Sequence, residues 1–295
     1  MSRFGTLLVA GSVLAVAGWT SFAGSPIPAV DAPLSLRANG AAQRIGNGTA
    51  RTYVLYDPAN RTVPIEVGVA LSAGALDQLP TPMVMTPEQM AEQMTNGHFD
   101  THLRLLELPA QNPTPYKFVQ FNWNPGGHEP PGVYDQPHFD FHFWTVPADV
   151  RNGILPSGAE YAAKAGRYPG AEFRAPFYVD AATAAQAPAA AVAVPEMGMH
   201  WLDGRSPEFR GQQFTKTFIY GSWDGQFVFD EPMITRDYIV AKRAAADPAQ
   251  RDEIVAIPTP ERRAVAGYYP QAYRISFDAE TNEYRIALTR LTWQQ

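Results

Sequence analysis

The 295-residue chain contains no cysteine. This absence excludes disulfide bonds, and it excludes a lipid-modified cysteine at the end of a leader segment. It also excludes thiolate ligands, so any metal ion must be bound by nitrogen and oxygen atoms. Histidine imidazoles and carboxylates are therefore the side chains from which a metal site would be built.

Clusters of lysine and arginine are missing as well. The chain has 23 basic and 29 acidic residues, which gives a formal net charge of −6 at pH 7. Nucleic acids and anionic membrane surfaces carry dense negative charge and are bound by basic patches. We therefore expect neither nucleic acid nor an anionic membrane surface as a partner.

A long apolar run occurs only at the N-terminus, and it is shorter than the roughly 20 residues that a membrane-spanning helix needs. Arg3 precedes apolar residues 5–18, and Ser-Phe-Ala at residues 21–23 provides small residues suited to cleavage. The pattern predicts a secretory signal peptide over residues 1–23, with an uncleaved anchor as the alternative. We expect the mature chain, residues 24–295, to be a single exported domain, periplasmic or extracellular, without stable membrane insertion.

Strand-forming segments dominate the remaining sequence. Hydrophobic residues make up 45% of the chain, enough for a packed core, and 27 prolines and 23 glycines imply many turns. The expected strands are residues 51–56, 65–71, 103–108, 116–123, 137–146, 214–222, 226–229, 272–277 and 284–291. Asp-Gly at residues 224–225 indicates a tight hairpin. These signals predict a mainly β domain, an antiparallel sandwich or barrel-like sheet with a few short helices and long loops.

Helical signals are fewer. Thr-Pro-Glu opens a predicted helix over residues 86–94, because it offers an N-cap, a first-turn proline and early negative charge. Residues 161–165 and 235–246 are also expected to be helical. The alanine-rich stretch 181–194 contains Pro188, and we interpret it as a surface loop or a poorly ordered helix.

Four of the six histidines lie between residues 128 and 200, in two segments rich in carboxylates and aromatics. The first segment contains His128 and the block Pro-His-Phe-Asp-Phe-His-Phe at residues 137–143, and the second contains His200. Imidazole is the commonest protein ligand for zinc and related metals. The main alternative to a metal site is a buried network in which Asp140 pairs with histidines to fix a β core.

The aromatic block alternates in a way that suits a strand. A strand would place His138, Asp140 and His142 on one face and the intervening phenylalanines on the other. On a straight strand His138 and His142 would lie roughly 13 Å apart, too far to share one ion. Three arrangements remain open: a bulge that brings the two histidines together, an i,i+2 pair with Asp140 completed by a distant ligand, or Asp140 as a partner that orients an imidazole.

From these residues we predict a divalent-metal site, with zinc as the first choice and copper, nickel and iron left open. Folding is expected to bring His138, His142 and His200 around one ion. His128 would be a fourth ligand or a close neighbour. Asp140 would lie outside the ligand shell and accept a hydrogen bond from an imidazole.

Three functions are compatible with such a site. The first is a structural metal, or binding of metal or a partner, at a closed four-ligand site. The second is a zinc-type hydrolase or lyase that uses metal-activated water, with Glu129 or Glu231 as general base. The third is a non-haem iron oxygenase built on His138, Asp140 and His200. The sequence identifies no small-molecule substrate.

Five sequence blocks also carry a family resemblance. They are Gly-Asn-Gly-Thr-Ala at 46–50, Gly-His-Glu-Pro at 127–130, Pro-His-Phe-Asp-Phe-His-Phe at 137–143, Met-Gly-Met-His-Trp at 197–201 and Glu-Pro-Met-Ile-Thr at 231–235. With them the chain resembles, from about residue 36 to its end, a domain-of-unknown-function family of exported bacterial proteins, one member of which is under extracytoplasmic sigma-factor control. The resemblance implies an envelope protein with a largely β fold and with homo-oligomerisation as an option. It supplies no catalytic residues.

Overall fold

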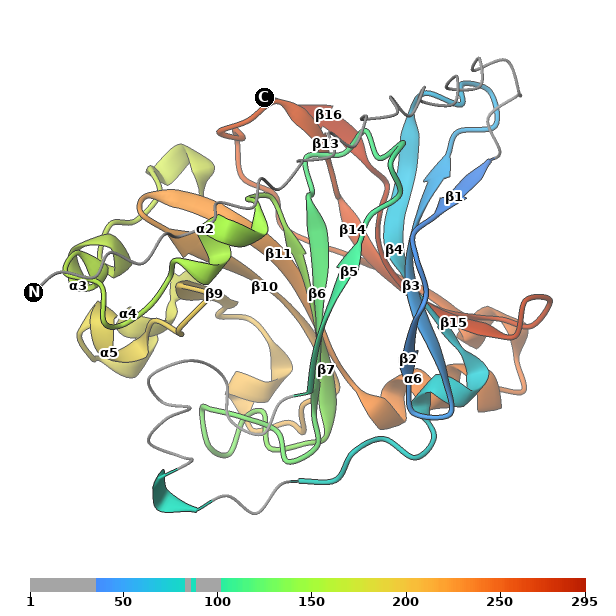
Figure 1. Ribbon diagram of the computed structural model, residues 1–295, viewed down its shortest axis with the longest axis horizontal. Helices are drawn as coiled ribbons and strands as arrows, with labels where there is room; N and C mark the ends of the chain where they lie inside the picture. The colour runs from blue at the N-terminus through green and yellow to red at the C-terminus, as the bar shows by residue number, and fades with distance from the viewer. Residues whose placement is uncertain (1–35, 83–85, 89–101) are drawn as a thin grey trace, which may run out of the picture. The chain divides into compact units, whose positions relative to one another are not determined.

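Two seven-stranded antiparallel sheets form the body of the computed structural model (Figure 1). The structure describes residues 36–82, 86–88 and 102–295. The predicted signal peptide and most of the helix predicted from residue 86 lie outside these ranges. Residues 35–295 form one compact unit, and the description below concerns that unit alone.

The first sheet combines strands from the beginning and the end of the chain, in the order β1-β3-β4-β15-β14-β12, with β2 paired to β3. Its strands are β1 Arg37–Asn39, β2 Gln43–Ile45, β3 Gly48–Tyr56, β4 Pro64–Ser72, β12 Asp252–Ala256, β14 Ala272–Asp278 and β15 Glu283–Thr289. The strands expected at residues 51–56 and 65–71 pair as β3–β4, and those expected at residues 272–277 and 284–291 pair as β14–β15.

The second sheet uses the middle of the chain, in the order β5-β6-β7-β11-β10-β9-β8. Its strands are β5 His102–Glu107, β6 Phe118–Asn124, β7 His138–Trp144, β8 Tyr178–Asp180, β9 Met199–Asp203, β10 Lys216–Trp223 and β11 Gln226–Thr235. A small third sheet pairs β13 Gly267–Tyr269 with β16 Thr292–Gln294. Asp224 and Gly225 have positive φ values of 51° and 82°, which the predicted hairpin turn between β10 and β11 requires.

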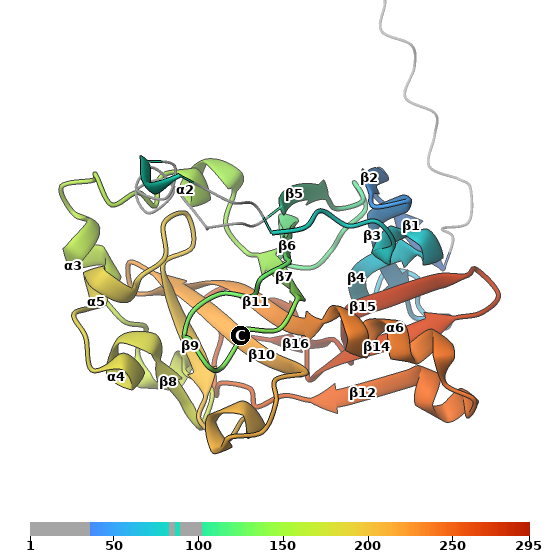
Figure 2. The ribbon, with the colours of Figure 1, turned by 90° about the horizontal axis from the view of Figure 1, so that it is seen from below.

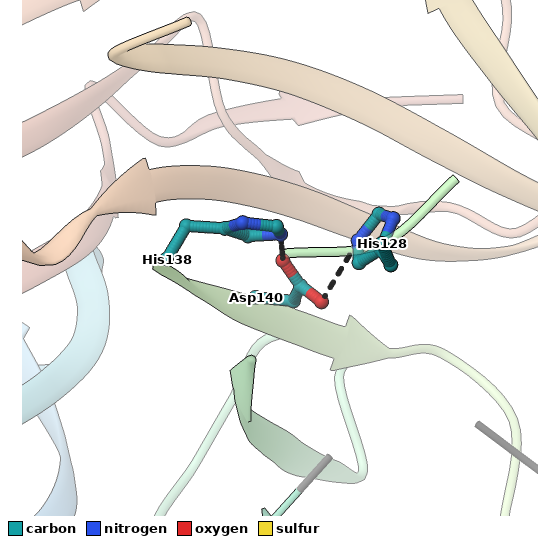
Figure 3. A group of neighbouring side chains, drawn as sticks. All are labelled: His128, His138 and Asp140. Atoms are coloured by element: carbon teal, nitrogen blue, oxygen red, sulfur yellow. Dashed lines mark ion pairs between the residues drawn. The ribbon is translucent and has the colours of Figure 1, made fainter. Parts of the chain in front are cut away.

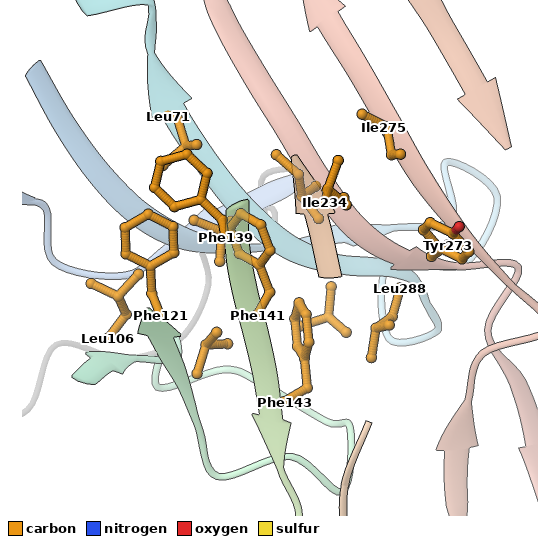
Figure 4. Close-up of a cluster of buried hydrophobic side chains, with 14 of the residues drawn as sticks. Leu71, Leu106, Phe121, Phe139, Phe141, Phe143, Ile234, Tyr273, Ile275 and Leu288 are labelled. Atoms are coloured by element: carbon orange, nitrogen blue, oxygen red, sulfur yellow. The ribbon is translucent and has the colours of Figure 1, made fainter. Parts of the chain in front are cut away.

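The hydrophobic core lies between the two large sheets (Figure 4). Phe139, Phe141 and Phe143 of β7 are fully buried in it. They belong to one cluster with side chains of the first sheet that include Leu71 and Leu288. The mainly β, antiparallel sandwich prediction is therefore confirmed, and each large sheet is open within the described residues. The alternation of β7 turns its polar residues away from this core.

Short helices lie mostly beside the second sheet, grouped near β8 and β9 (Figures 1 and 2). They are α2 Ala148–Asn152, α3 Tyr161–Ala165, α4 Ala181–Ala185 and α5 Ala189–Val192, while α6 Arg236–Ala244 follows β11. The 3₁₀ turns are η1 Ala73–Leu76, η2 Ala171–Phe173, η3 Pro207–Arg210 and η4 Pro248–Arg251. No helix in the described part of the chain is long and apolar enough to cross a membrane.

Two helices match their predicted positions, and the alanine-rich stretch differs. α3 and α6 lie where residues 161–165 and 235–246 were expected to be helical. Residues 181–194, expected as a loop or a poorly ordered helix, contain both α4 and α5. The carboxylate of Asp180 accepts a hydrogen bond from the Thr183 amide and caps α4. Pro188 then precedes α5, because its fixed φ suits a helix start.

The aromatic core yields a stability prediction. The ring of Phe141 is fully buried, and its centroid lies 5.1 Å from that of Phe121. Phe141→Ala is expected to lower the free energy of unfolding by about 3–5 kcal/mol, because it removes buried surface and leaves a cavity. Val265→Ala, at a side chain 62% exposed, is the control, and it should change that free energy by less than about 0.5 kcal/mol. Urea denaturation measures both, and equal effects would contradict the assigned core.

Candidate metal centre

A buried layer of polar side chains lies on the face of the second sheet opposite the phenylalanines. Strand register pairs the polar residues of β6 and β7 as Gln120 with His142, Asn122 with Asp140 and Asn124 with His138. None of these residues is more than 2% exposed. Because directly paired residues of neighbouring strands project from the same face, the six polar side chains form one layer.

The four histidines of the two predicted segments fall into two groups, each with one carboxylate. The first group is His128, His138 and Asp140, and the second group is His142, His200 and Glu231. In each group, one ligand atom from every residue lies within 4.8 Å of the others. This spacing suits a single metal ion per group.

In the first group the carboxylate of Asp140 lies between two imidazoles (Figure 3). Its Oδ1 is 3.2 Å from Nε2 of His138, and its Oδ2 is 3.5 Å from Nε2 of His128. His138 and Asp140 are neighbours on one face of β7, while His128 comes from the loop between β6 and β7. The side-chain amide of Asn124 donates a 2.6 Å hydrogen bond to Oδ2 and holds the carboxylate in place.

Backbone carbonyls fix the tautomer of both imidazoles in the first group. Nδ1 of His138 lies 2.7 Å from the carbonyl oxygen of Gln136, and Nδ1 of His128 lies 2.7 Å from that of Glu129. A carbonyl oxygen only accepts hydrogen bonds, so each Nδ1 carries a proton. In a neutral imidazole, Nε2 then presents a lone pair to the Asp140 carboxylate. Two electron-rich atoms that face each other require a cation between them, either a proton or a metal ion.

The second group joins three strands: His142 from β7, Glu231 from β11 and His200 from β9. Nε2 of His142 is 3.3 Å from Oε1 of Glu231, and Nε2 of His200 is 3.7 Å from Oε2. The register partner of His200 on the intervening strand β10 is Gly221. Because Gly221 has no side chain, nothing projects from that position between His200 and Glu231.

Gly221 also sets the position of an aromatic ring that packs on both imidazoles of the second group. The ring of Phe229 lies 4.8 Å from that of His142 and 5.4 Å from that of His200, measured between centroids. A Cβ at position 221 would come within 2.0 Å of the Phe229 ring. The absence of a side chain at Gly221 is therefore part of the geometry of the second group.

Burial controls the charges of the two groups. It raises the pKa of Glu231 well above its ordinary value, and the negative charge of Asp140 raises that pKa further. Burial also lowers the pKa of His200 to about 4, so this imidazole is neutral at pH 7. Burial opposes ionisation of Asp140 too, but the neighbouring imidazole of His138 holds the pKa of Asp140 well below its usual range. A divalent cation would supply the positive charge that two buried carboxylates need.

Three buried ligand atoms of these groups have no hydrogen-bond partner within the described ranges. They are Nε2 of His138, Oδ1 of Asp140 and Oε2 of Glu231. Buried polar atoms rarely lack a partner, and each of these belongs to a ligand type that divalent metals accept. The residues present therefore fit a metal ion in each group.

The observed arrangement differs from the predicted single ion. β7 pairs with β6 without a register shift, so no bulge brings His138 and His142 together. His138 instead pairs with Asp140 two residues away and is completed by His128. Asp140, expected to lie outside the ligand shell, is itself a member of the first group. His200 joins His142 in the second group and does not approach the pair of His138 and Asp140.

The two carboxylates expected as general bases have different positions. Glu231 is 2% exposed and belongs to the second group, where its carboxylate faces the imidazoles of His142 and His200. Glu129 is exposed and belongs to neither group. Glu129 contacts the first group through its backbone carbonyl, which accepts a hydrogen bond from Nδ1 of His128.

Tyr134 lies near the first group and is influenced by Glu208, although the sequence did not point to either residue. The ring of Tyr134 is 5.8 Å from that of His128 and 6.4 Å from that of His138. Its hydroxyl and Oε1 of Glu208 are buried and have no hydrogen-bond partner in the part of the chain described. Burial raises the pKa of Tyr134, and the negative charge of Glu208 adds to this. Both residues lie outside the long strands, where no periodic pattern marks a role.

Comparison with family models, curated proteins and solved structures gave no match. The resemblance to the exported family therefore stays a prediction.

The packing at Gly221 yields a second prediction. Gly221→Ala is expected to lower the free energy of unfolding by about 1–3 kcal/mol, because the new Cβ must displace the Phe229 ring. Gly204→Ala is the control, since a Cβ there meets its nearest atom at 3.4 Å, an ordinary contact. Urea denaturation compares the two variants. If both behave like the parent, the close packing described for the second group is wrong.

Proposed function

We propose that this protein binds divalent metal ions at the two histidine–carboxylate groups. The observation that carries the proposal is the first group, in which two imidazoles with fixed Nδ1 protons turn their Nε2 atoms toward one buried carboxylate. The second group repeats this chemistry with Glu231, whose Oε2 has no hydrogen-bond partner among the described residues. A cation resolves the electrostatic conflict in both groups.

Zinc is the metal that we propose first. Two imidazoles and one carboxylate are a ligand set that zinc accepts, and the chain contains no cysteine that would favour softer metals. Iron accepts the same set in non-haem sites. Elemental analysis distinguishes these metals directly.

A structural or metal-binding role is the function that the burial of the groups favours. The most exposed side chains of the two groups are His128 at 19% and His200 at 13%, while the others are 3% exposed or less. Such burial restricts the approach of a substrate. A metal ion in the first group would link β7 with the loop that carries His128, and one in the second group would link β7, β9 and β11; both would stabilise the arrangement of these elements.

One observation favours an alternative, a zinc-type hydrolase or lyase. Each group offers three protein ligands rather than four, and three ligands leave a coordination position for water. A metal ion there would lower the pKa of the bound water and make it a nucleophile. In this role Glu231 would be a ligand, so a different group would have to accept the proton.

We also propose that the protein is exported and that it forms homo-oligomers. The charged, apolar and small-residue pattern of residues 1–23 supports secretion to the periplasm or beyond. The family resemblance supports homo-oligomerisation. Fractionation of cells that produce the full chain, followed by sedimentation of the mature protein, tests both points.

Elemental analysis of protein purified without an affinity tag tests the metal sites. The parent should carry one divalent ion for each of the two groups. His138→Ala and Asp140→Asn should each lose the ion of the first group, and His200→Ala should lose the ion of the second group. Asp140→Asn keeps the shape of the side chain, and therefore separates loss of metal from loss of folding.

His102→Ala is the matched control, because His102 lies on β5 outside both groups. It should retain the metal content of the parent. Trace metal in the parent, or unchanged metal in all the variants of the two groups, would reject the proposal.

Chelation provides a further prediction. Removal of the metal with a chelator is expected to lower the thermal midpoint of the parent, and added zinc should restore it. The reason is mass action: a ligand at a hundred times its dissociation constant stabilises the native state by about 2.7 kcal/mol. A variant that carries both Asp140→Asn and His200→Ala should not respond to either treatment. A parent that is equally stable with and without chelator would argue against structural metal.

A further inference from the structure

A cavity of about 580 Å³ lies on the other side of β11 from the second group. Asp230 lines this cavity, whereas the adjacent Glu231 belongs to the second group. Successive residues of a strand point to opposite faces, so one strand contributes to both features. Other parts of the wall come from residues 113–115, Lys117, residues 262–267 and Trp293. The volume lies within the range of small-molecule sites.

The cavity is positively charged in an otherwise acidic protein. Lys117, Arg262 and Arg263 are among its lining residues, and Asp230 is the one acidic residue among them in the part of the chain described. The Tyr116 hydroxyl donates a hydrogen bond to Asp230. With a formal net charge of −6 on the whole chain, this concentration of cations marks a place where an anion would be attracted.

Arg263 is held in an orientation that leaves one nitrogen for a ligand. Its Nε donates a 3.1 Å hydrogen bond to Oε1 of Gln294, and its guanidinium lies 4.3 Å from the centre of the Tyr269 ring. Its Nη2 is buried and has no hydrogen-bond partner within the ranges that the structure describes. Buried guanidinium nitrogens normally find an acceptor, and a carboxylate or phosphate oxygen matches them well.

Aromatic side chains complete the walls of the cavity. Phe173, Phe227, Tyr269 and Trp293 line it together with the cations. Trp293 is 60% exposed, which is unusual for so large an apolar side chain. Flat aromatic walls beside cationic side chains favour a ligand with a flat apolar body and an acidic end.

We propose that this cavity binds a small organic anion with a flat aromatic body. The carboxylate or phosphate of the ligand would pair with Arg263, supported by Arg262 and Lys117. The aromatic body would pack against Trp293 and its neighbours. This proposal is independent of the metal groups, because it uses none of their residues.

Calorimetric titration with 2-naphthoate, and with the neutral 2-naphthamide of the same shape, tests the proposal. We expect saturable binding of 2-naphthoate, and binding of the amide weaker by about tenfold, since the charged hydrogen bond is lost. Arg263→Gln should weaken 2-naphthoate binding by about tenfold for the same reason. Arg262→Gln, at an exposed residue, should weaken it in the same direction without affecting folding.

Arg104→Gln is the control, because Arg104 is an exposed arginine of β5 and does not line the cavity. It changes the net charge equally and should leave the affinity unchanged. Absence of saturable binding, equal affinity for the acid and the amide, or equal affinity of the parent and both cavity variants would overturn the proposal. Metal content measured on the same samples should not change, so the outcome is separable from that of the metal sites.

Discussion

The two-residue period of β7 is the constraint on which the candidate metal centre depends. Because alternate side chains leave opposite faces of a strand, the burial of three phenylalanines in the core turns His138, Asp140 and His142 to the other face. A shift of one residue would exchange the two sets and bury charge in the sandwich. The hydrophobic core and the metal ligands are thus fixed by the same backbone geometry.

The polar layer on that face is held at both ends by hydrogen bonds. Nε of Arg151, on α2, donates a 2.8 Å hydrogen bond to Gln120, and Gln120 donates to Asn122. At the other end Asn124 donates to Asp140. Buried polar groups are costly unless they are paired, and these bonds pair the amides. What these bonds leave uncompensated is the approach of imidazole lone pairs to carboxylate oxygens. A bound cation would neutralise this repulsion, and no other side chain would be needed.

The strand β11 contributes one residue to the second histidine–carboxylate group and the next residue to the cationic cavity. Its pairing with β7 skips Glu231 and Pro232, and Pro232 has no N–H to donate to the ladder. Glu231 therefore projects from an interrupted part of the ladder toward the imidazoles, while Asp230 faces the cationic cavity. Glu231 and Asp230 thus serve opposite faces of one strand, although Phe229 both packs on the imidazoles of the second group and lines the cavity. This separation allows metal binding and anion binding to be tested one at a time.

The sequence by itself determined the β architecture, its main hairpins and the two faces of β7, because strand period and turn chemistry act between near neighbours. It also indicated the histidines, but it predicted one shared ion. Only the tertiary structure decided that His128 completes the first group and that His200 joins His142 across two intervening strands. Strand order is set by packing between distant segments, and no local pattern encodes it. For the same reason the sequence does not reveal why residue 221 is a glycine. The structure shows that a side chain there would collide with the ring of Phe229.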